Sequence, residues 1–397
     1  ADWAASGEGM TLGGGDPAMA LAHAVEVNAL TLDGSDGATL TASWTYAPAL
    51  IGEAEVHDLA QRWFRALEAL VRHAEQPNAG GRTPSDLPLV ALSQDEIEDL
   101  EKQYPQLEDI LPLSPLQEGL LFHALYDARA PDVYTVQLVL SLQGRLDEEA
   151  LKAAAQALIE RHAGLRAAFR HEGLSRPVQI IVPGAQAPWR SIDLSLLDAG
   201  DREQRLAGIL EEDRAERFDV GCPPLLRFAL IRLSADEHRL VLTNHHLLMD
   251  GWSMPVLVRE LLTLYAQHGD VSALPRVTPY RDYLAWVAAQ DRAAALAAWQ
   301  DALAGLDEGT RLAPPDRARA PVSPEQITHL LSDTLTTELS QQARRHGLTL
   351  NTLIQAAWGM LLGRLSGRDD VVFGVTVAGR PPEIAGIETM VGLFINT

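Results

Sequence analysis

Segments with the apolar periods of strands and of helices alternate along the central part of the chain. Residues 134–144 (YTVQLVLSLQG) carry apolar side chains at every second position, which predicts a β-strand. Asp147 follows as a candidate N-cap for a helix that ends near His162. Further apolar runs predict strands at 176–182, 224–233 and 239–244, with a helix at 254–268. Such a mixture of elements predicts an α/β (α+β) fold.

The sequence of residues 1–90 predicts a unit separate from the rest of the chain. Residues 23–32 and 38–46 alternate apolar and polar side chains around the turn sequence DGSDG, which indicates a β-hairpin. Apolar residues at helical spacing predict a helix over 53–74, and residues 75–88 are rich in Gly, Pro, Asn and Ser. A short acidic helix is expected at 94–103. We interpret 1–90 as the end of one domain, 91–108 as a linker and 109 onward as a second domain.

Composition excludes several classes of protein. The formal net charge of -22 disfavours binding to nucleic acid or to acidic membranes. The single Cys222 rules out an internal disulfide framework, and no apolar run reaches the roughly 20 residues of a membrane helix. The first ten residues, ADWAASGEGM, do not form a signal peptide. We therefore predict a cytoplasmic protein. The absence of an initial Met and the apolar final residues VGLFINT predict a piece of a longer chain.

The stretch LTNHHLLMDGWS, residues 242–253, brings two adjacent histidines to the end of a predicted strand. Residues at such a strand–loop–helix turn are held firmly yet reach a cleft. Three interpretations are open: a buried pair with satisfied hydrogen bonds, a metal site that uses His246 and Asp250, or general acid–base catalysis. The metal site lacks an evident third ligand. The residues of this stretch alone do not decide among the three.

Six motifs in order make the chain resemble the condensation domains of non-ribosomal peptide synthetases. HHLLMDG matches the HHxxxDG motif of that family, and the resemblance covers residues 109 to 397. The other five are LPLSPLQEGLLFH (111–123), RHAGLRAAF (161–169), YRDYLAWVAAQ (280–290), VVFGVTVAGRP (371–381) and IETMVGLFINT (387–397). Residues 1–90 resemble the C-terminal end of a preceding condensation or epimerisation domain.

The resemblance implies a fold and a reaction. The fold would be two chloramphenicol-acetyltransferase-like lobes that meet at a tunnel, with the first lobe at 109–272 and an incomplete second lobe at 273–397. Two carrier proteins would present acyl groups on 4'-phosphopantetheine, and the acceptor amine would attack the donor thioester. The partners implied are donor and acceptor peptidyl carrier domains and a neighbouring adenylation domain. No cofactor bound by the domain itself and no metal are expected.

The family motif also assigns roles to single residues. His246 is the candidate that contacts the attacking amine, while His245 is expected to support the loop. Asp250 is expected to be structural and paired with an arginine, for which Arg166 is the candidate. Gly251 is expected to permit the turn and to keep the tunnel open. Four further residues are candidates for lining the substrate channel, although two of them could simply begin a helix: Ser114, Gln117, Trp252 and Ser253. The aromatic residues Tyr283 and Trp286 are expected to pack in the core.

Alternative functions within the superfamily remain open at this point. An epimerisation domain shares the histidine motif, but VVFGVTVAGRP lacks the glutamate and histidine that such domains usually carry there. A cyclising domain would have DxxxxD in place of the histidines, and a recruitment or scaffold module commonly has a degraded motif. The first motif, PLSPLQEGLLFH, resembles the variant of condensation domains that take a D-configured donor and an L-configured acceptor.

The end of the chain predicts a loss of stability. If later elements of the second lobe are missing, the apolar side chains of 371–373, 391 and 393–395 lose part of their cover. We expect the 397-residue piece alone to be inactive and to aggregate, with the region beyond about 275 the first to be cleaved by proteases.

Overall fold

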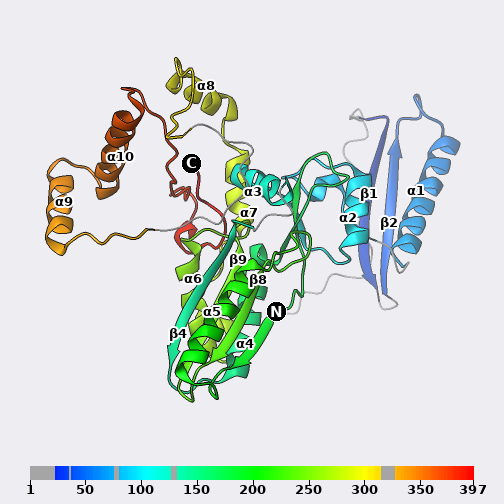
Figure 1. Cartoon of the computed structure of the whole chain (residues 1–397). Coiled ribbons are helices and arrows are strands. Elements are labelled where there is room, and N and C mark those ends of the chain that lie inside the picture. Colours follow the sequence, from blue (N-terminus) through cyan, green and yellow to red (C-terminus); the bar gives the residue numbers. More distant parts are fainter. Residues whose placement is uncertain (1–22, 35–36, 76–79, 127–131, 314–326) are drawn as a thin grey trace, which may run out of the picture. The chain divides into compact units, whose positions relative to one another are not determined.

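The computed structural model describes residues 23–34, 37–75, 80–126, 132–313 and 327–397, in two compact units (Figure 1). The first unit, residues 1–81, contains the hairpin of β1 (Val25–Gly34) and β2 (Gly37–Tyr46), followed by α1 (Glu53–Ala74). The indole rings of Trp44 on β2 and Trp63 on α1 meet edge to face, with centroids 6.0 Å apart. The expected hairpin and helix are therefore confirmed.

The second unit, residues 82–397, is built around a four-stranded sheet of order β4-β9-β8-β7. Its strands are β4 (Thr135–Gln143), β7 (Trp189–Asp193), β8 (Leu226–Arg232) and β9 (Glu237–His245). Helices α4 (Glu148–Arg161) and α6 (Ser253–Ala266) pack together and share one core with this sheet. As expected, the Asp147 side chain caps α4 by accepting a hydrogen bond from Ala150 N.

Helices cover both faces of the four-stranded sheet, and the side chains of β8 pack alternately against the two helical layers. Phe228 and Leu230 belong to the core with α4 and α6, whereas Ala229 and Ile231 pack with Ile209 of α5 (Ala199–Ala215). Successive side chains of a strand point to opposite faces, so one strand serves both layers. The sheet is thereby fixed from both sides, and the end of β9 is held with it.

Residues 91–108, expected as a linker, are packed into the second unit. They contain α2 (Gln94–Gln103), whose Ile97 and Leu100 are buried with Ile110 and Ile180. Those two residues belong to the three-stranded sheet β3-β6-β5, formed by β3 (Asp109–Pro112), β6 (Val178–Ile181) and β5 (Ala167–Arg170). The apolar side of the short acidic helix explains why the segment does not extend into solvent as a linker would.

The remaining helices follow in chain order. They are α3 (Pro115–Tyr126), α7 (Tyr280–Ala288), α8 (Arg292–Ala302), α9 (Asp333–Arg345) and α10 (Leu350–Ser366). None of the helices in the described part of the chain is both long and apolar enough to cross a membrane.

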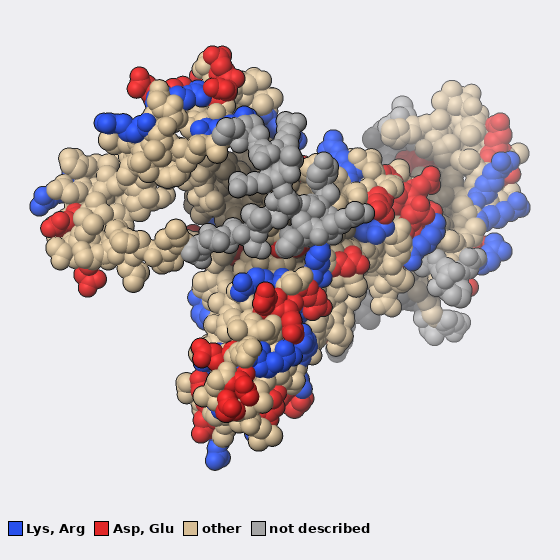
Figure 2. Space-filling model, viewed as in Figure 1, with Lys and Arg blue, Asp and Glu red and all other residues tan. Residues whose placement is uncertain are grey.

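The C-terminal segment corrects one expectation about exposed apolar residues. Val391, Leu393 and Phe394 are at most 4% exposed and belong to the core around α6 and β9, whereas Val372 is 38% exposed. The larger exposed apolar surface instead lies on α10, whose only charged side chain is that of Arg364; Figure 2 shows the charged side chains of the chain. The exposed members of that apolar surface are Ile354, Trp358, Met360, Leu361 and Leu365.

Candidate functional site

The end of β9 carries the two histidines into the site. His245 is the last residue of the strand and pairs with Thr135 of β4. His246 follows, and its backbone N–H donates to the carbonyl of Tyr134 over 2.8 Å. The His245 side chain is fully buried, whereas His246 keeps partial exposure. Of the pair, therefore, His246 is the one with access to solvent.

Contacts on both nitrogens hold the imidazole of His245. Its Nδ1 accepts a hydrogen bond of 3.0 Å from Leu247 N, and its Nε2 lies 3.1 Å from Oδ2 of Asp132. This agrees with a supporting role for His245. Asp132 was missed by sequence reasoning, because its only signal is its position just before the strand that pairs with β9.

The ring of His246 is not held in this way. Its Nδ1 is shielded from solvent and has no hydrogen-bond partner among the described residues. An imidazole without a committed nitrogen can accept or donate a proton near neutral pH. His246 is thus partly exposed, and the structure gives its Nδ1 no contact like the one that Leu247 N makes with Nδ1 of His245.

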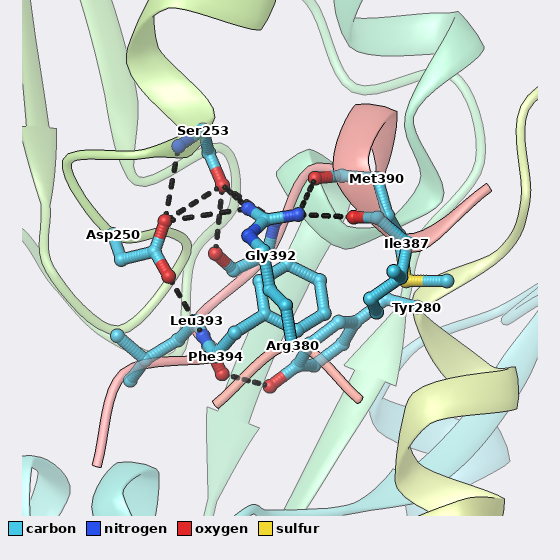
Figure 3. A network of polar contacts seen from close by, with 9 residues as sticks. All are labelled: Asp250, Ser253, Tyr280, Arg380, Ile387, Met390, Gly392, Leu393 and Phe394. Carbon is cyan, nitrogen blue, oxygen red and sulfur yellow. Dashed lines mark hydrogen bonds and ion pairs between the residues drawn. The ribbon is translucent and has the colours of Figure 1, made fainter. Parts of the chain in front are cut away.

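A dense polar network surrounds Asp250 (Figure 3). Its Oδ1 accepts hydrogen bonds of 3.0 Å from both the backbone N–H and the hydroxyl of Ser253, and its Oδ2 accepts one from Phe394 N. Nη2 of Arg380 lies 3.5 Å from Oδ1 and donates to Ser253 Oγ over 3.1 Å. Because Asp250 and Arg380 are almost completely buried, the pair joins the histidine loop to the C-terminal segment.

Arg380 is held by further contacts on the other side of its guanidinium. Its Nη1 donates to the carbonyls of Ile387 and Met390, and its carbon Cζ lies 4.0 Å from the ring centroid of Phe394. Burial lowers the pKa of Arg380, while the charge of Asp250 opposes that shift. The guanidinium therefore bridges the Asp250 loop and residues 387–394.

The structure corrects the expected partner of Asp250. Arg166, the candidate from the RHAGLRAAF motif, instead forms an ion pair of 2.6 Å with Glu108 and donates to the carbonyl of Val182. The true partner, Arg380, comes from VVFGVTVAGRP, a motif whose sequence drew attention only for its missing acid–base residues. Both motifs contain an arginine, so the motifs alone left the choice open.

The channel candidates from the first motif are also corrected. Ser114 and Gln117 are at most 3% exposed and form a reciprocal cap at the start of α3: Ser114 N donates to Gln117 Oε1, and Gln117 N donates to Ser114 Oγ. Nε2 of Gln117 also donates to the carbonyl of Leu247 over 2.9 Å. These residues support the histidine loop from the protein interior rather than lining a channel.

The remaining residues of the motif divide between surface and core. Gly251 and Trp252 are exposed, and Trp252 is 57% exposed. Ser253 is fully buried and is the first residue of α6, so the N-cap position belongs to Trp252. A Cβ on Gly251 would meet no atom within 4 Å, and its φ lies outside the left-handed region. The turn therefore does not require glycine, although open space does surround it.

Trp286 is partly buried against the core, as predicted, and Tyr283, the other predicted core residue, is buried together with Tyr280. Both tyrosines are 7% exposed, their rings stack with centroids 5.4 Å apart, and both contact the ring of Phe394. The hydroxyl of Tyr280 donates to the carbonyl of Leu393 over 2.7 Å, and burial raises its pKa above the ordinary value. The two tyrosine rings and the guanidinium of Arg380 therefore all contact the ring of Phe394. Among the described residues, no group of acidic, histidine or cysteine side chains could hold a metal ion.

Comparison with known proteins identifies the family. Residues 107–397 match the family described as Condensation domain. One of the linear gramicidin synthase proteins of Brevibacillus parabrevis is 39% identical over 381 residues, which are 94% of this chain and 5% of that protein. Bacitracin synthase 1 of Bacillus licheniformis is 35% identical over 382 residues, which are 94% of this chain and 7% of that protein.

A solved structure shows the fold. The first condensation domain of the calcium-dependent antibiotic synthetase, in complex with a substrate analogue, superposes with a TM-score of 0.59 at 24% identity. The match covers 72% of this chain and 67% of that one. The expected chloramphenicol-acetyltransferase-like fold is thereby confirmed.

Proposed function

This chain belongs to the condensation-domain family of non-ribosomal peptide synthetases, and from that premise we propose that it joins two carrier-bound acyl groups by a peptide bond. The nitrogen of the acceptor amine attacks the carbonyl carbon of the donor thioester. The C–N bond forms, the C–S bond breaks, and the proton lost by the amine balances the thiolate that leaves. The chain spans about 5% of the gramicidin synthase protein that it matches, so the rest of the assembly is part of this proposal.

One observation carries the proposal. His246 is partly exposed and its Nδ1 has no partner among the described residues, while the neighbouring His245 is buried, accepts a hydrogen bond from Leu247 N on Nδ1 and has Nε2 3.1 Å from Oδ2 of Asp132. The site thus presents one partly exposed imidazole that the described contacts do not hold through Nδ1. A free α-amine has a pKa near 8, so a weak base or a positioned acceptor is sufficient to assist its attack.

Proton abstraction and positioning are both compatible with this geometry. A positioned base typically accelerates a reaction about 10²- to 10⁴-fold, and holding two tethered substrates together can contribute as much. His246 is assigned to the amine in either case. Asp250 and Arg380 keep the loop in place, and Gly251 and Trp252 lie at its exposed side.

The partners follow from the reaction. Donor and acceptor carrier domains would present the two thioesters on 4'-phosphopantetheine, with an adenylation domain loading the acceptor and the whole assembly in the cytoplasm. Residues 1–90 would belong to a preceding condensation or epimerisation domain. In support of this, the match to the gramicidin synthase extends over 94% of the chain and therefore into its first unit.

The donor is proposed to end in a D residue and the acceptor to be an L residue. The first-motif sequence PLSPLQEGLLFH supports this assignment, as does the superfamily unit that precedes it.

The test is a condensation assay in the complete domain. Each donor epimer is loaded on the upstream carrier, an L-aminoacyl group is loaded on the downstream carrier, and dipeptide is measured by mass spectrometry. We expect dipeptide from the D donor and little from the L donor. Preference for the L donor would contradict the stereochemical part alone. Epimerised donor without dipeptide would indicate an epimerisation domain, and no product from either epimer would favour a recruitment module.

A further inference from the structure

A carboxylate that is absent from the HHxxxDG motif lies beside its first histidine. Asp132 precedes β4, and its side chain is 5% exposed. One oxygen, Oδ1, accepts a hydrogen bond of 3.0 Å from Tyr134 N, and the other lies 3.1 Å from Nε2 of His245. The two oxygens therefore connect the beginning of β4 to the end of β9.

These contacts indicate which ring nitrogen of His245 carries the proton. Because Nδ1 accepts the Leu247 N–H, the ring proton of His245 must be on Nε2, which faces Asp132. The direction between Nε2 and Oδ2 is off the ideal line for a hydrogen bond, so the attraction is chiefly electrostatic. A carboxylate oxygen is the partner that this tautomer requires.

His246 lies between the two anchored positions. The residue before it is held by Asp132, the residue after it donates to the His245 ring, and its own N–H donates to the carbonyl of Tyr134. The Tyr134 backbone is in turn bound to Asp132 through its N–H. Asp132 thus constrains the His246 backbone through two separate connections.

The surroundings of Asp132 keep its carboxyl ionised. Burial alone would raise its pKa, but the contact with His245, the Tyr134 N–H and the charge of Arg217 outweigh that effect and hold it below the ordinary value. A buried charge persists when it is paired and hydrogen-bonded.

We propose that Asp132 is a positioning residue that, through the tautomer and orientation of His245, fixes the turn that presents His246. Its consequence for catalysis rests on the condensation activity proposed above, whereas its consequence for the His245 ring does not.

The substitution Asp132→Asn tests this with almost unchanged volume. An asparagine has one side-chain oxygen for the two N–H groups that Asp132 serves. If the oxygen faces Tyr134, the amide NH₂ faces His245 and favours a ring proton on Nδ1, which then cannot accept from Leu247. If the oxygen faces His245, the bond from Tyr134 is lost. In either arrangement, one of the hydrogen bonds that hold the turn around His246 is lost.

The first measurement is the His245 tautomer itself. Long-range ¹H–¹⁵N correlation spectra of the ¹⁵N-histidine-labelled 397-residue chain report which ring nitrogen carries the proton, and His245→Gln assigns the signal. We expect the Nε2–H form in the wild type and a changed tautomer or ring signal in Asp132→Asn. A wild-type ring protonated on Nδ1 would overturn the proposal, even if the variant did not fold.

The second measurement separates positioning from folding. In the condensation assay, Asp132→Asn should lower kcat about 10- to 100-fold with little change in KM for either carrier. Asp213→Asn is the matched control, because it also alters a buried aspartate of this unit, paired with Arg227, without touching either histidine. The control should lower the melting temperature but leave the His245 signal unchanged. A folded Asp132→Asn with wild-type kcat would refute the positioning role, whereas an inactive wild type would refute the proposed function while the spectra still decide the ring contact.

Discussion

The backbone N–H of Phe394 donates a hydrogen bond of 3.0 Å to Oδ2 of Asp250, across 144 residues of sequence. Arg380 and Ser253 complete the shell around the same carboxylate. The aspartate of the histidine motif is thus fully engaged in holding two distant segments together, whereas His246 of the same motif remains partly exposed.

Replacing Asp250 should therefore destabilise the second unit. Asp250→Ala leaves Arg380 buried without its counter-charge, and breaking such a pair typically costs about 3–5 kcal/mol. Chemical denaturation followed by circular dichroism measures the loss. In a double-mutant cycle, Arg380→Ala should couple strongly to Asp250→Ala, whereas Arg166→Ala should add to it within about 0.5 kcal/mol. Coupling to Arg166 instead would contradict the pairing described here.

His246→Ala should act on the reaction and not on the fold. We expect the rate of dipeptide formation in the complete domain to fall by at least about 10²-fold with an unchanged melting temperature. His171→Ala serves as the control, since His171 is exposed and lies away from the motif. A near-normal rate in folded His246→Ala would exclude the assigned role.

Substitution by alanine should affect stability very differently at two glycines near the site. Gly251→Ala should change the free energy of unfolding by less than about 0.5 kcal/mol, because its added Cβ meets open space. Gly392→Ala should be severely destabilising, because a Cβ there would clash with the buried ring of Tyr280. Thermal melts of the two variants provide the comparison, and equal melting temperatures would show that the packing of Tyr280 against Gly392 has been misassigned.

Acid should weaken the second unit through its buried carboxylates. Burial alone would raise the pKa of Glu260, but His162 and Arg161 outweigh it and hold that pKa below the ordinary value. Asp213, paired with Arg227, is shifted in the same direction. A depressed pKa means that the unfolded chain binds the proton more readily, so this stability is present above about pH 4–5 and is lost as pH falls further.

The measurement is the melting temperature between pH 3 and 7. Asp213→Asn should flatten the acid side of the curve, and Asp236→Asn, at an exposed loop position, should change it less. An identical acid slope in Asp213→Asn and the wild type would contradict the contribution of the buried pair.

The local pattern of apolar residues was sufficient to predict the helices and hairpins that depend on local contacts. The bounds of α1 follow from apolar spacing over 53–74, and the hairpin follows from alternation around a glycine-rich turn. The delivery of His245 and His246 by a strand also follows from sequence, because a strand run and a helix run flank them. The period of the apolar residues shows which face of each helix or strand is buried, and these features need no information about distant segments.

Only the tertiary structure decided which distant residues meet. Several arginines could pair with Asp250, and packing chose Arg380 because Gly392 and Phe394 bring that segment against α6. Asp132 contacts His245 through the β4–β9 register, which no spacing in the chain reveals. The same packing buries Ser114 and Gln117 beneath the histidine loop. A single chain gives each residue a type and a local period, whereas the partner of a buried charge is set by three-dimensional packing between segments more than a hundred residues apart.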